Sequence, residues 1–149
     1  MDDQLKKLFG SKTNDFMKWL HKQSPFEPSW RMMDIDALLL WANEPCAVID
    51  YKTKYEQITQ SEEWSYLWFL GKGIPCYIVR IVSPSVTGMT VEQMLESVNS
   101  FRFAIEEMHS FENEISTMCI NRNANINGLA EWERSIREKK RISKQSFFD

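Results

Sequence analysis

Residues 33–52, MDIDALLLWANEPCAVIDYK, carry the pattern from which the fold can be predicted. Two short apolar runs, LLLW and AVI, are separated by a polar turn, and acidic residues lie at both outer ends. Continuous apolar runs of this length, bounded by turn residues, are typical of buried strands. The segment therefore predicts a β-hairpin that begins near Asp34 and Asp36 and ends in the run Asp50-Tyr51-Lys52.

The length of the hairpin loop decides which of these side chains meet, because the side chains of a strand alternate between its two faces. Asp50 and Lys52 share one face of the second strand. A three-residue loop, Asn43-Glu44-Pro45, would place Asp36 across from Lys52 and diagonal to Asp50, with Cβ atoms roughly 7 Å apart. A two-residue loop would place the two aspartates on opposite faces unless a β-bulge intervened. A shared site therefore requires the three-residue loop or a bulge, and Pro45 in the turn is compatible with this requirement.

Two carboxylates and a lysine at one end of a hairpin are the groups that metal-dependent phosphodiester hydrolysis requires. Mg²⁺ prefers oxygen ligands and keeps several waters. We expect Asp36 and Asp50 to bind the ion, with the backbone carbonyl of Tyr51 as a third ligand. The metal would activate a bound water, and Lys52 would orient that water or balance charge on the phosphate. Asp34 is either a second-metal or outer-shell ligand or a solvated strand end.

The same acidic residues also have an ordinary structural explanation, since aspartates are common at strand ends and in turns. The context favours the catalytic interpretation, because a predicted helix at 60–70 and a predicted buried strand at 75–82 follow at short spacing. Trp64, Leu67 and Trp68 recur at helical spacing on that helix. Such aromatic residues either pack in the core or stack on bases, and the first is more common.

The order Asp36, thirteen residues, Asp50-Tyr51-Lys52, helix and strand resembles the PD-(D/E)XK nuclease superfamily. More narrowly, Ile35-Asp36 followed by Ile49-Asp50-Tyr51-Lys52-Thr53 is similar to its RecB-type exonuclease branch and the small phage and archaeal relatives of that branch. The resemblance covers about residues 13–82. It implies an α/β fold with a restriction-endonuclease-like αβββαβ core, in which helices flank a mixed sheet.

The resemblance also implies hydrolysis of DNA, less often RNA, with Mg²⁺ or Mn²⁺. It implies metal-ligand roles for Asp36 and Asp50 and a catalytic role for Lys52. Members of this branch often carry a glutamine on the helix after the lysine, and Gln60 (or Gln57) is the nearest match. Many also carry a glutamate on the first helix, where this chain offers only Asp15.

Composition indicates one modest domain over residues 1–149. No apolar run reaches the length of a membrane span, and the first residues, MDDQLKK, lack a signal-peptide pattern, so we expect a cytoplasmic protein. The three cysteines lack C-x-x-C spacing and only two histidines are present, which favours reduced thiols over a zinc site.

A net charge of −3 argues mildly against a nucleic-acid partner, because neutralising phosphates usually requires a basic balance. Basic residues do cluster near the two ends of the sequence: Lys6, Lys7, Lys12, Lys18 and Lys22, and then Arg134, Arg137, Lys139, Lys140, Arg141 and Lys144. Either cluster would suit a DNA backbone. A solvated helix end, with cations near the negative end of the helix dipole, explains them equally well.

The second half of the chain is less informative about function. Thr90 and Gln93 form a capping box that predicts a helix to about Asn99. Apolar residues alternate with polar ones in the run FRFAIE at 101–106, which predicts a half-buried strand. Residues 121–128 are polar and predict an exposed loop, and residues 129–141 predict an amphipathic helix that buries Leu129, Trp132 and Ile136.

These patterns lead to one functional hypothesis and two alternatives. The first is a small metal-dependent deoxyribonuclease; with one site, it would cut both strands by successive nicks or as a homodimer. The second is a catalytically weak or inactive nuclease-fold module that binds nucleic acid or a protein partner. The third is a structural or adaptor domain in which the Asp-Tyr-Lys end has no chemical role.

Overall fold

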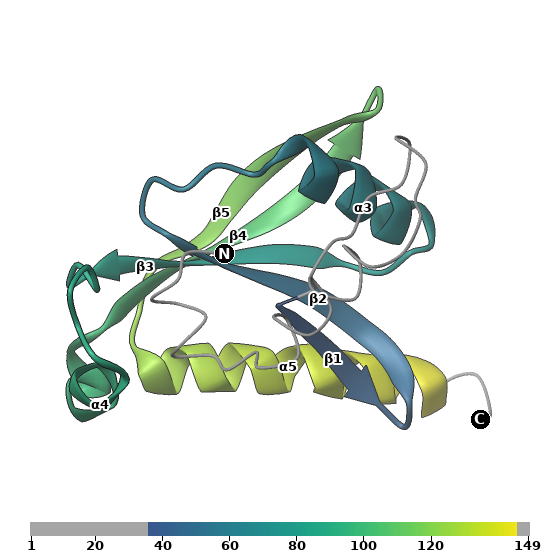
Figure 1. Ribbon diagram of the computed structural model, residues 1–149. Coiled ribbons are helices and arrows are strands. Elements are labelled where there is room, and N and C mark those ends of the chain that lie inside the picture. Colours follow the sequence, from purple (N-terminus) through teal and green to yellow (C-terminus); the bar gives the residue numbers. More distant parts are fainter. Residues whose placement is uncertain (1–35, 146–149) are drawn as a thin grey trace, which may run out of the picture.

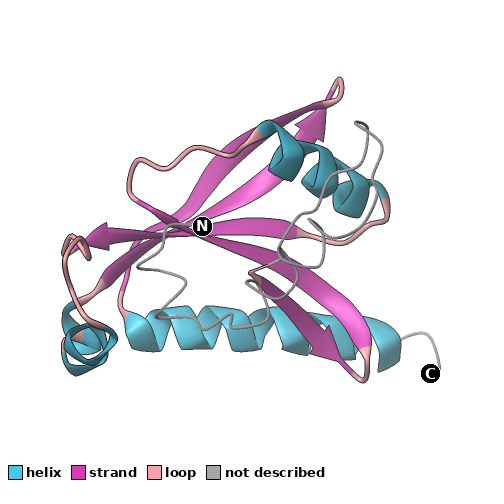
Figure 2. Cartoon of the chain, viewed as in Figure 1, coloured by secondary structure: helices cyan, strands magenta, loops and turns pink. Residues whose placement is uncertain are grey.

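The predicted hairpin forms the first two strands of a five-stranded mixed β-sheet with helices on both faces (Figures 1 and 2). This arrangement comes from a computed structural model that describes residues 36–145. The elements are β1 (Ala37–Trp41), β2 (Glu44–Thr53), α3 (Gln60–Gly71), β3 (Cys76–Ser83), α4 (Val91–Glu96), a 3₁₀ turn (Val98–Ser100), β4 (Arg102–Phe111), β5 (Glu114–Ala124) and α5 (Ile126–Gln145). The fold class is therefore α/β.

The strands lie in the order β1-β2-β3-β4-β5. Only β2 and β3 are parallel, and the other neighbouring pairs are antiparallel. A parallel pair needs a crossover connection, which α3 supplies. Helix α5 runs along the opposite face of the sheet (Figure 1). The carboxyl ends of β2 and β3 therefore lie side by side at the same end of the sheet.

The apolar runs of β2 and β3 are continuous because both strands are covered on both faces. Val48 and Ile78 pack with Tyr66 in the cluster under α3. Ile49 and Val79 belong to the larger cluster under α5, which also holds Phe103, Ile105, Leu129 and Ile136. Lys52 lies on the same face of β2 as Val48, so its side chain is directed into the layer between the sheet and α3.

The hairpin turn is the second of the two alternatives, a two-residue loop with a bulge, and not the three-residue loop at residues 43–45. Ala42 and Asn43 form a two-residue turn with φ of 50° and 64°, and Trp41 pairs with Glu44. The register then shifts between Leu40 and Leu39, which is the irregularity that a β-bulge produces. The bulge restores the alternation that a two-residue loop would have reversed, so Asp36 and Asp50 fall on the same face.

The apolar run of β1 is buried on one side only, which corrects the prediction of a fully buried strand. Leu39 is 5% exposed, whereas Leu38 and Leu40 are 40% and 47% exposed. β1 is an edge strand of the described sheet, and α3 packs mainly on β3, β4 and β5. Within residues 36–145, the face of β1 that is turned towards α5 is therefore the covered one.

Helix α3 begins and ends close to its predicted bounds, but its buried side is different from the one expected. Trp64 and Trp68 are 55% and 59% exposed, while Tyr66 is 2% exposed. Phe69 and Leu70 pack beside Tyr66 against the sheet. The two tryptophans therefore face away from the core.

Farther along the chain, β3, the capping box at Thr90 and the alternation of β4 are confirmed. The exposed loop predicted for residues 121–128 is wrong, because β5 continues to Ala124 and α5 begins at Ile126. β5 is the other edge strand and most of its side chains are exposed, so a polar sequence is compatible with it. No helix within residues 36–145 is long and apolar enough to cross a membrane.

Replacing Ala42 by glycine should stabilise the protein by about 1 kcal/mol, because φ near 50° is strained for any residue with a Cβ atom. Urea unfolding measures the change in free energy of unfolding. The matched control is Ala130→Gly on the exposed side of α5, which should destabilise by about 1 kcal/mol. Destabilisation by both changes would contradict the turn geometry.

Candidate active site

Asp36 lies opposite Asp50 when the hairpin register is continued by one residue beyond the Ala37–Ile49 pair. The backbone N–H of Tyr51 donates a hydrogen bond of 2.9 Å to Oδ2 of Asp36. This bond holds the Asp36 carboxylate against the last residues of β2. The two aspartates predicted to share a site are therefore adjacent, directly opposite each other rather than diagonal.

Asp50 is buried, with 2% of its surface exposed. The Tyr66 hydroxyl of α3 donates a hydrogen bond of 2.5 Å to its Oδ2 atom, and the Lys52 Nζ atom lies 3.2 Å from the same oxygen. Burial raises the pKa of Asp50 to about 8, and the neighbouring Asp36 carboxyl adds to the rise, while Tyr66 and Lys52 oppose it. Two carboxyls this close favour a proton or a cation between them.

Lys52 is surrounded by carboxylates. Its Nζ atom lies 3.2 Å from Oε1 of Glu62 and 3.4 Å from Oε2 of Glu56, in addition to Asp50, and the residue is 1% exposed. Burial by itself would lower the pKa of Lys52, but the three carboxylates outweigh this effect and raise the pKa. The side chain is therefore an ammonium ion at neutral pH.

Local structure explains why Glu62 reaches this lysine. Glu62 closes the capping box of α3: its backbone N–H donates to the Thr59 hydroxyl, and its Oε1 atom accepts a bond of 2.9 Å from the Thr59 N–H. The same carboxylate also accepts from Lys52. Helix α3 thus begins at the site, and one side chain both caps the helix and fixes the ammonium.

Glu56 is held by the connection between β2 and α3. Its Oε1 atom accepts a bond from the backbone N–H of Thr53, and its carbonyl accepts a 2.6 Å bond from Nη1 of Arg80. Arg80 also donates to the Thr53 carbonyl and pairs with Glu106 on β4. The loop after Lys52 is therefore tied to the centre of the sheet.

Sequence reasoning did not find Glu56, Glu62 or Tyr66. The available signal was the spacing of Thr59, Glu62 and Tyr66, since a capping box followed by a tyrosine four residues later places both side chains on one helix face. Gln60, the predicted supporting residue, is the first residue of α3 and is exposed. Its role stays a prediction.

The remaining ligand candidates are Tyr51 and Asp34. The N–H and C=O of one strand residue point to the same side. The Tyr51 carbonyl therefore faces the edge at which Asp36 lies, as the predicted ligand role requires. Asp34 and Asp15 lie outside the described residues. Within residues 36–145, no three side chains of His, Cys, Asp or Glu are grouped to hold a metal ion.

The basic residues of α5 are largely engaged with acids on the same surface. Lys144 lies 2.7 Å and Lys140 3.8 Å from a carboxylate oxygen of Glu44, and Arg137 and Arg141 pair with Glu133 and Glu138. These contacts favour the interpretation of the basic cluster near the end of the chain as an ordinary solvated helix surface. The lysines near the start of the chain lie outside the described residues.

Comparisons with protein-family models, with curated proteins and with solved structures find no match to this chain. Function is therefore argued from the residues and geometry of the site.

The titration of the buried Asp50 carboxyl should make the stability of the metal-free protein depend on pH. A carboxyl that holds its proton more tightly when folded contributes stability that is full below its ordinary pKa of 3.8 and is lost as pH rises through about 8. Between about pH 5 and about pH 8, wild type should lose more than about 1 kcal/mol of stability relative to Asp50→Asn. Urea unfolding in EDTA measures this difference, and an equal difference at both pH values would contradict the burial of the acid.

Proposed function

We propose that this chain is a metal-dependent nuclease of the PD-(D/E)XK type that hydrolyses phosphodiester bonds of DNA. The observation that carries the proposal is the meeting of the Asp36 and Asp50 carboxyls beside a lysine ammonium 3.2 Å from Asp50. These groups come from the two ends of one hairpin, at the carboxyl end of a parallel strand. Ligands of α/β sheets commonly bind at such an edge.

The order of elements supports this fold type. The elements β1, β2, α3 and β3 follow one another in the order strand, strand, helix, strand. This order matches the last four elements of an αβββαβ core. The residues before Asp36 lie outside the described residues, so the first helix and strand of such a core stay a prediction. The candidate site lies where such a core carries its acids, on the second strand of the hairpin and at the start of the first.

The donor set fits Mg²⁺ or Mn²⁺, because every candidate ligand is an oxygen atom. Asp36 and Asp50 would hold the ion, with the carbonyl of Tyr51 as the third protein ligand. Two facing carboxyls with a single ammonium beside them also leave a negative charge that a cation would balance. When bound, the metal would polarise a phosphate oxygen and lower the pKa of a water molecule.

The other residues orient and stabilise these groups. The Tyr66 hydroxyl and the Tyr51 N–H each fix one carboxylate oxygen. Glu56 and Glu62 hold the Lys52 side chain, so the ammonium stays charged and in place. In a buried site of low dielectric, such a fixed charge stabilises the negative charge that builds on a phosphate in the transition state.

One observation favours the alternative of an inactive nuclease-fold module. Asp50 and Lys52 are only 2% and 1% exposed, and the lysine is already surrounded by carboxylates. An ion-pair network closed on itself would serve stability alone. The two functions differ in their chemistry, so an activity assay separates them.

The test is cleavage of labelled single- and double-stranded DNA, and of RNA, by the full chain with Mn²⁺, Mg²⁺ or EDTA. Wild type should cleave only with metal. Asp50→Asn and Lys52→Met should each lose roughly a hundredfold or more of the activity, because each removes a charge that acts in the transition state. Circular dichroism confirms folding of each variant, and Lys139→Met on α5 is the matched control that should keep full activity.

No cleavage of any substrate by wild type would overturn the nuclease proposal and leave the binding module. Cleavage that survives in Asp50→Asn and Lys52→Met would place the activity outside this site.

A further inference from the structure

An exposed aromatic residue follows the candidate site directly along the chain. Tyr55 comes two residues after the end of β2 and is 79% exposed. The Nζ atom of Lys54 lies 5.3 Å from the centre of its ring. A cation and an open aromatic face therefore stand together, three residues beyond Lys52. An extended chain spans at most roughly 3.6 Å per residue, so the Cα atoms of Tyr55 and Lys52 are at most roughly 11 Å apart.

Tyr55 and Lys54 border a pocket of about 430 Å³ at the carboxyl ends of β2 and β3. This volume is within the range of small-molecule sites. Ile81 and Val86, each 4% exposed, form an apolar floor, and Ser85 and Thr87 add hydroxyl groups to the lining. An apolar floor with hydroxyls and a cation at the rim suits a flat base that carries a sugar and a phosphate.

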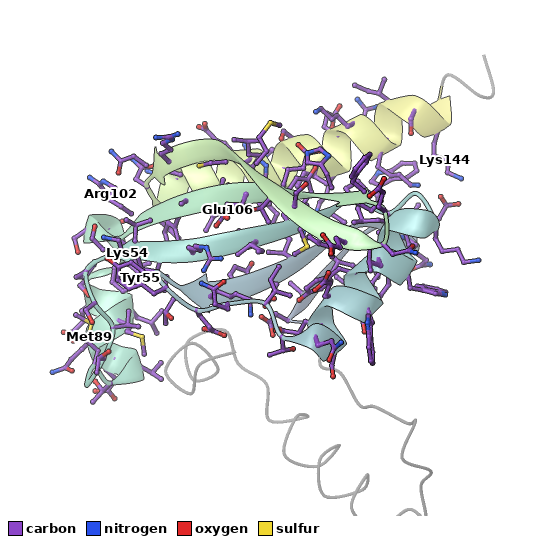
Figure 3. All side chains as sticks on the ribbon, turned by 90° about the horizontal axis from the view of Figure 1, so that it is seen from above. Lys54, Tyr55, Met89, Arg102, Glu106 and Lys144 are labelled. Atoms are coloured by element: carbon purple, nitrogen blue, oxygen red, sulfur yellow. The ribbon has the colours of Figure 1, made fainter. Side chains whose placement is uncertain are left out.

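The pocket and the candidate site lie at the same end of β2 but on opposite faces of the sheet, because Ile81 and Val86 belong to the cluster under α5 whereas Lys52 is directed towards α3. Thr53, the residue after Lys52, pairs with Ile81 across the two parallel strands, and both line the pocket. Figure 3 shows Lys54 and Tyr55 at the same end of the sheet as Arg102, whose strand partner is Ser83 of β3. This end of the sheet therefore carries a second cation, whose guanidinium donates to the carbonyls of Asn99 and Phe101.

We propose that Tyr55, Lys54 and this pocket form a nucleotide subsite for single-stranded nucleic acid. A base stacks on the Tyr55 ring and Lys54 contacts an adjoining phosphate, at the end of β2 that also carries Lys52. The substrate is single-stranded because a duplex base is already stacked on both sides and has no free face for the ring. This inference names the substrate class of the proposed nuclease and rests on that function.

The test measures binding rather than cleavage. Fluorescence anisotropy of a labelled single strand of about ten nucleotides, in EDTA, compares the full-length wild type with variants. Tyr55→Ala should weaken binding about tenfold or more, whereas Tyr55→Phe, which keeps the ring, should bind like wild type. Lys54→Gln should weaken binding and reduce the salt slope by about 0.7, the value for one phosphate contact on a single strand.

Phe111→Ala is the matched control. Phe111 is 72% exposed and lies at the opposite end of β4 from Arg102, so its loss should leave binding unchanged. A duplex of the same sequence should bind more weakly than the single strand and should not respond to Tyr55→Ala. A mononucleotide added as competitor should displace the strand only weakly if phosphate contacts along the strand contribute.

The results separate this inference from the proposed nuclease function. A loss of single-strand binding in Tyr55→Ala establishes the subsite even where wild type cleaves nothing, and only the nuclease proposal then fails. Cleavage by wild type together with unchanged binding in Tyr55→Ala overturns the subsite and leaves the nuclease. An equal loss in Phe111→Ala, or tight displacement by the mononucleotide alone, also overturns a strand-binding subsite at Tyr55.

Discussion

The burial of the Lys52 ammonium is the constraint on which the described structure depends. Removing a charged group from water costs several kcal/mol unless partners compensate for the lost hydration. The compensation comes from Asp50 on the same strand and from Glu56 and Glu62 on the segment that follows. Because Glu62 also caps α3, the start of this helix is fixed to β2, and the Tyr66 bond to Asp50 fixes its next turn.

The charges around Lys52 do not balance, because more carboxyl groups than ammonium groups meet here. Three carboxyl groups, those of Asp50, Glu56 and Glu62, contact one ammonium, and a fourth, that of Asp36, lies beside Asp50. Burial raises the pKa of Asp50, and the neighbouring Asp36 carboxyl adds to the rise, so that without a cation a proton relieves part of the excess. A divalent cation between Asp36 and Asp50 would relieve the same excess.

Much of the fold and the centre of the site could be predicted from local sequence. The apolar runs of β2 and β3 and the alternation of β4 give clear periodic signals, and the spacing of Asp36, Asp50 and Lys52 places them at one end of a hairpin. The loop length could not be decided from the sequence because Ala42 and Asn43 adopt positive φ without the glycine that usually marks such a turn. The bulge that follows has no sequence signal beyond Pro45.

The errors in the prediction arise from tertiary contacts that no local pattern contains. The helical spacing of Trp64 and Trp68 favours a buried side, yet Tyr66 takes that position because its hydroxyl has a buried acceptor in Asp50. β5 is polar because its side chains are exposed at the sheet edge, so it lacks the apolar alternation by which strands are predicted.

The most direct test of the central claim is Mn²⁺ binding by the full chain, measured by isothermal titration calorimetry near neutral pH. Wild type should bind Mn²⁺, and Asp36→Asn and Asp50→Asn should each abolish or greatly weaken the binding. Glu107→Gln, two strands away on β4 and on the face of the sheet that α5 covers, should leave it unchanged. Absence of Mn²⁺ binding in wild type, or binding that both aspartate variants retain, would contradict the assignment of the Asp36–Asp50 pair as a metal site.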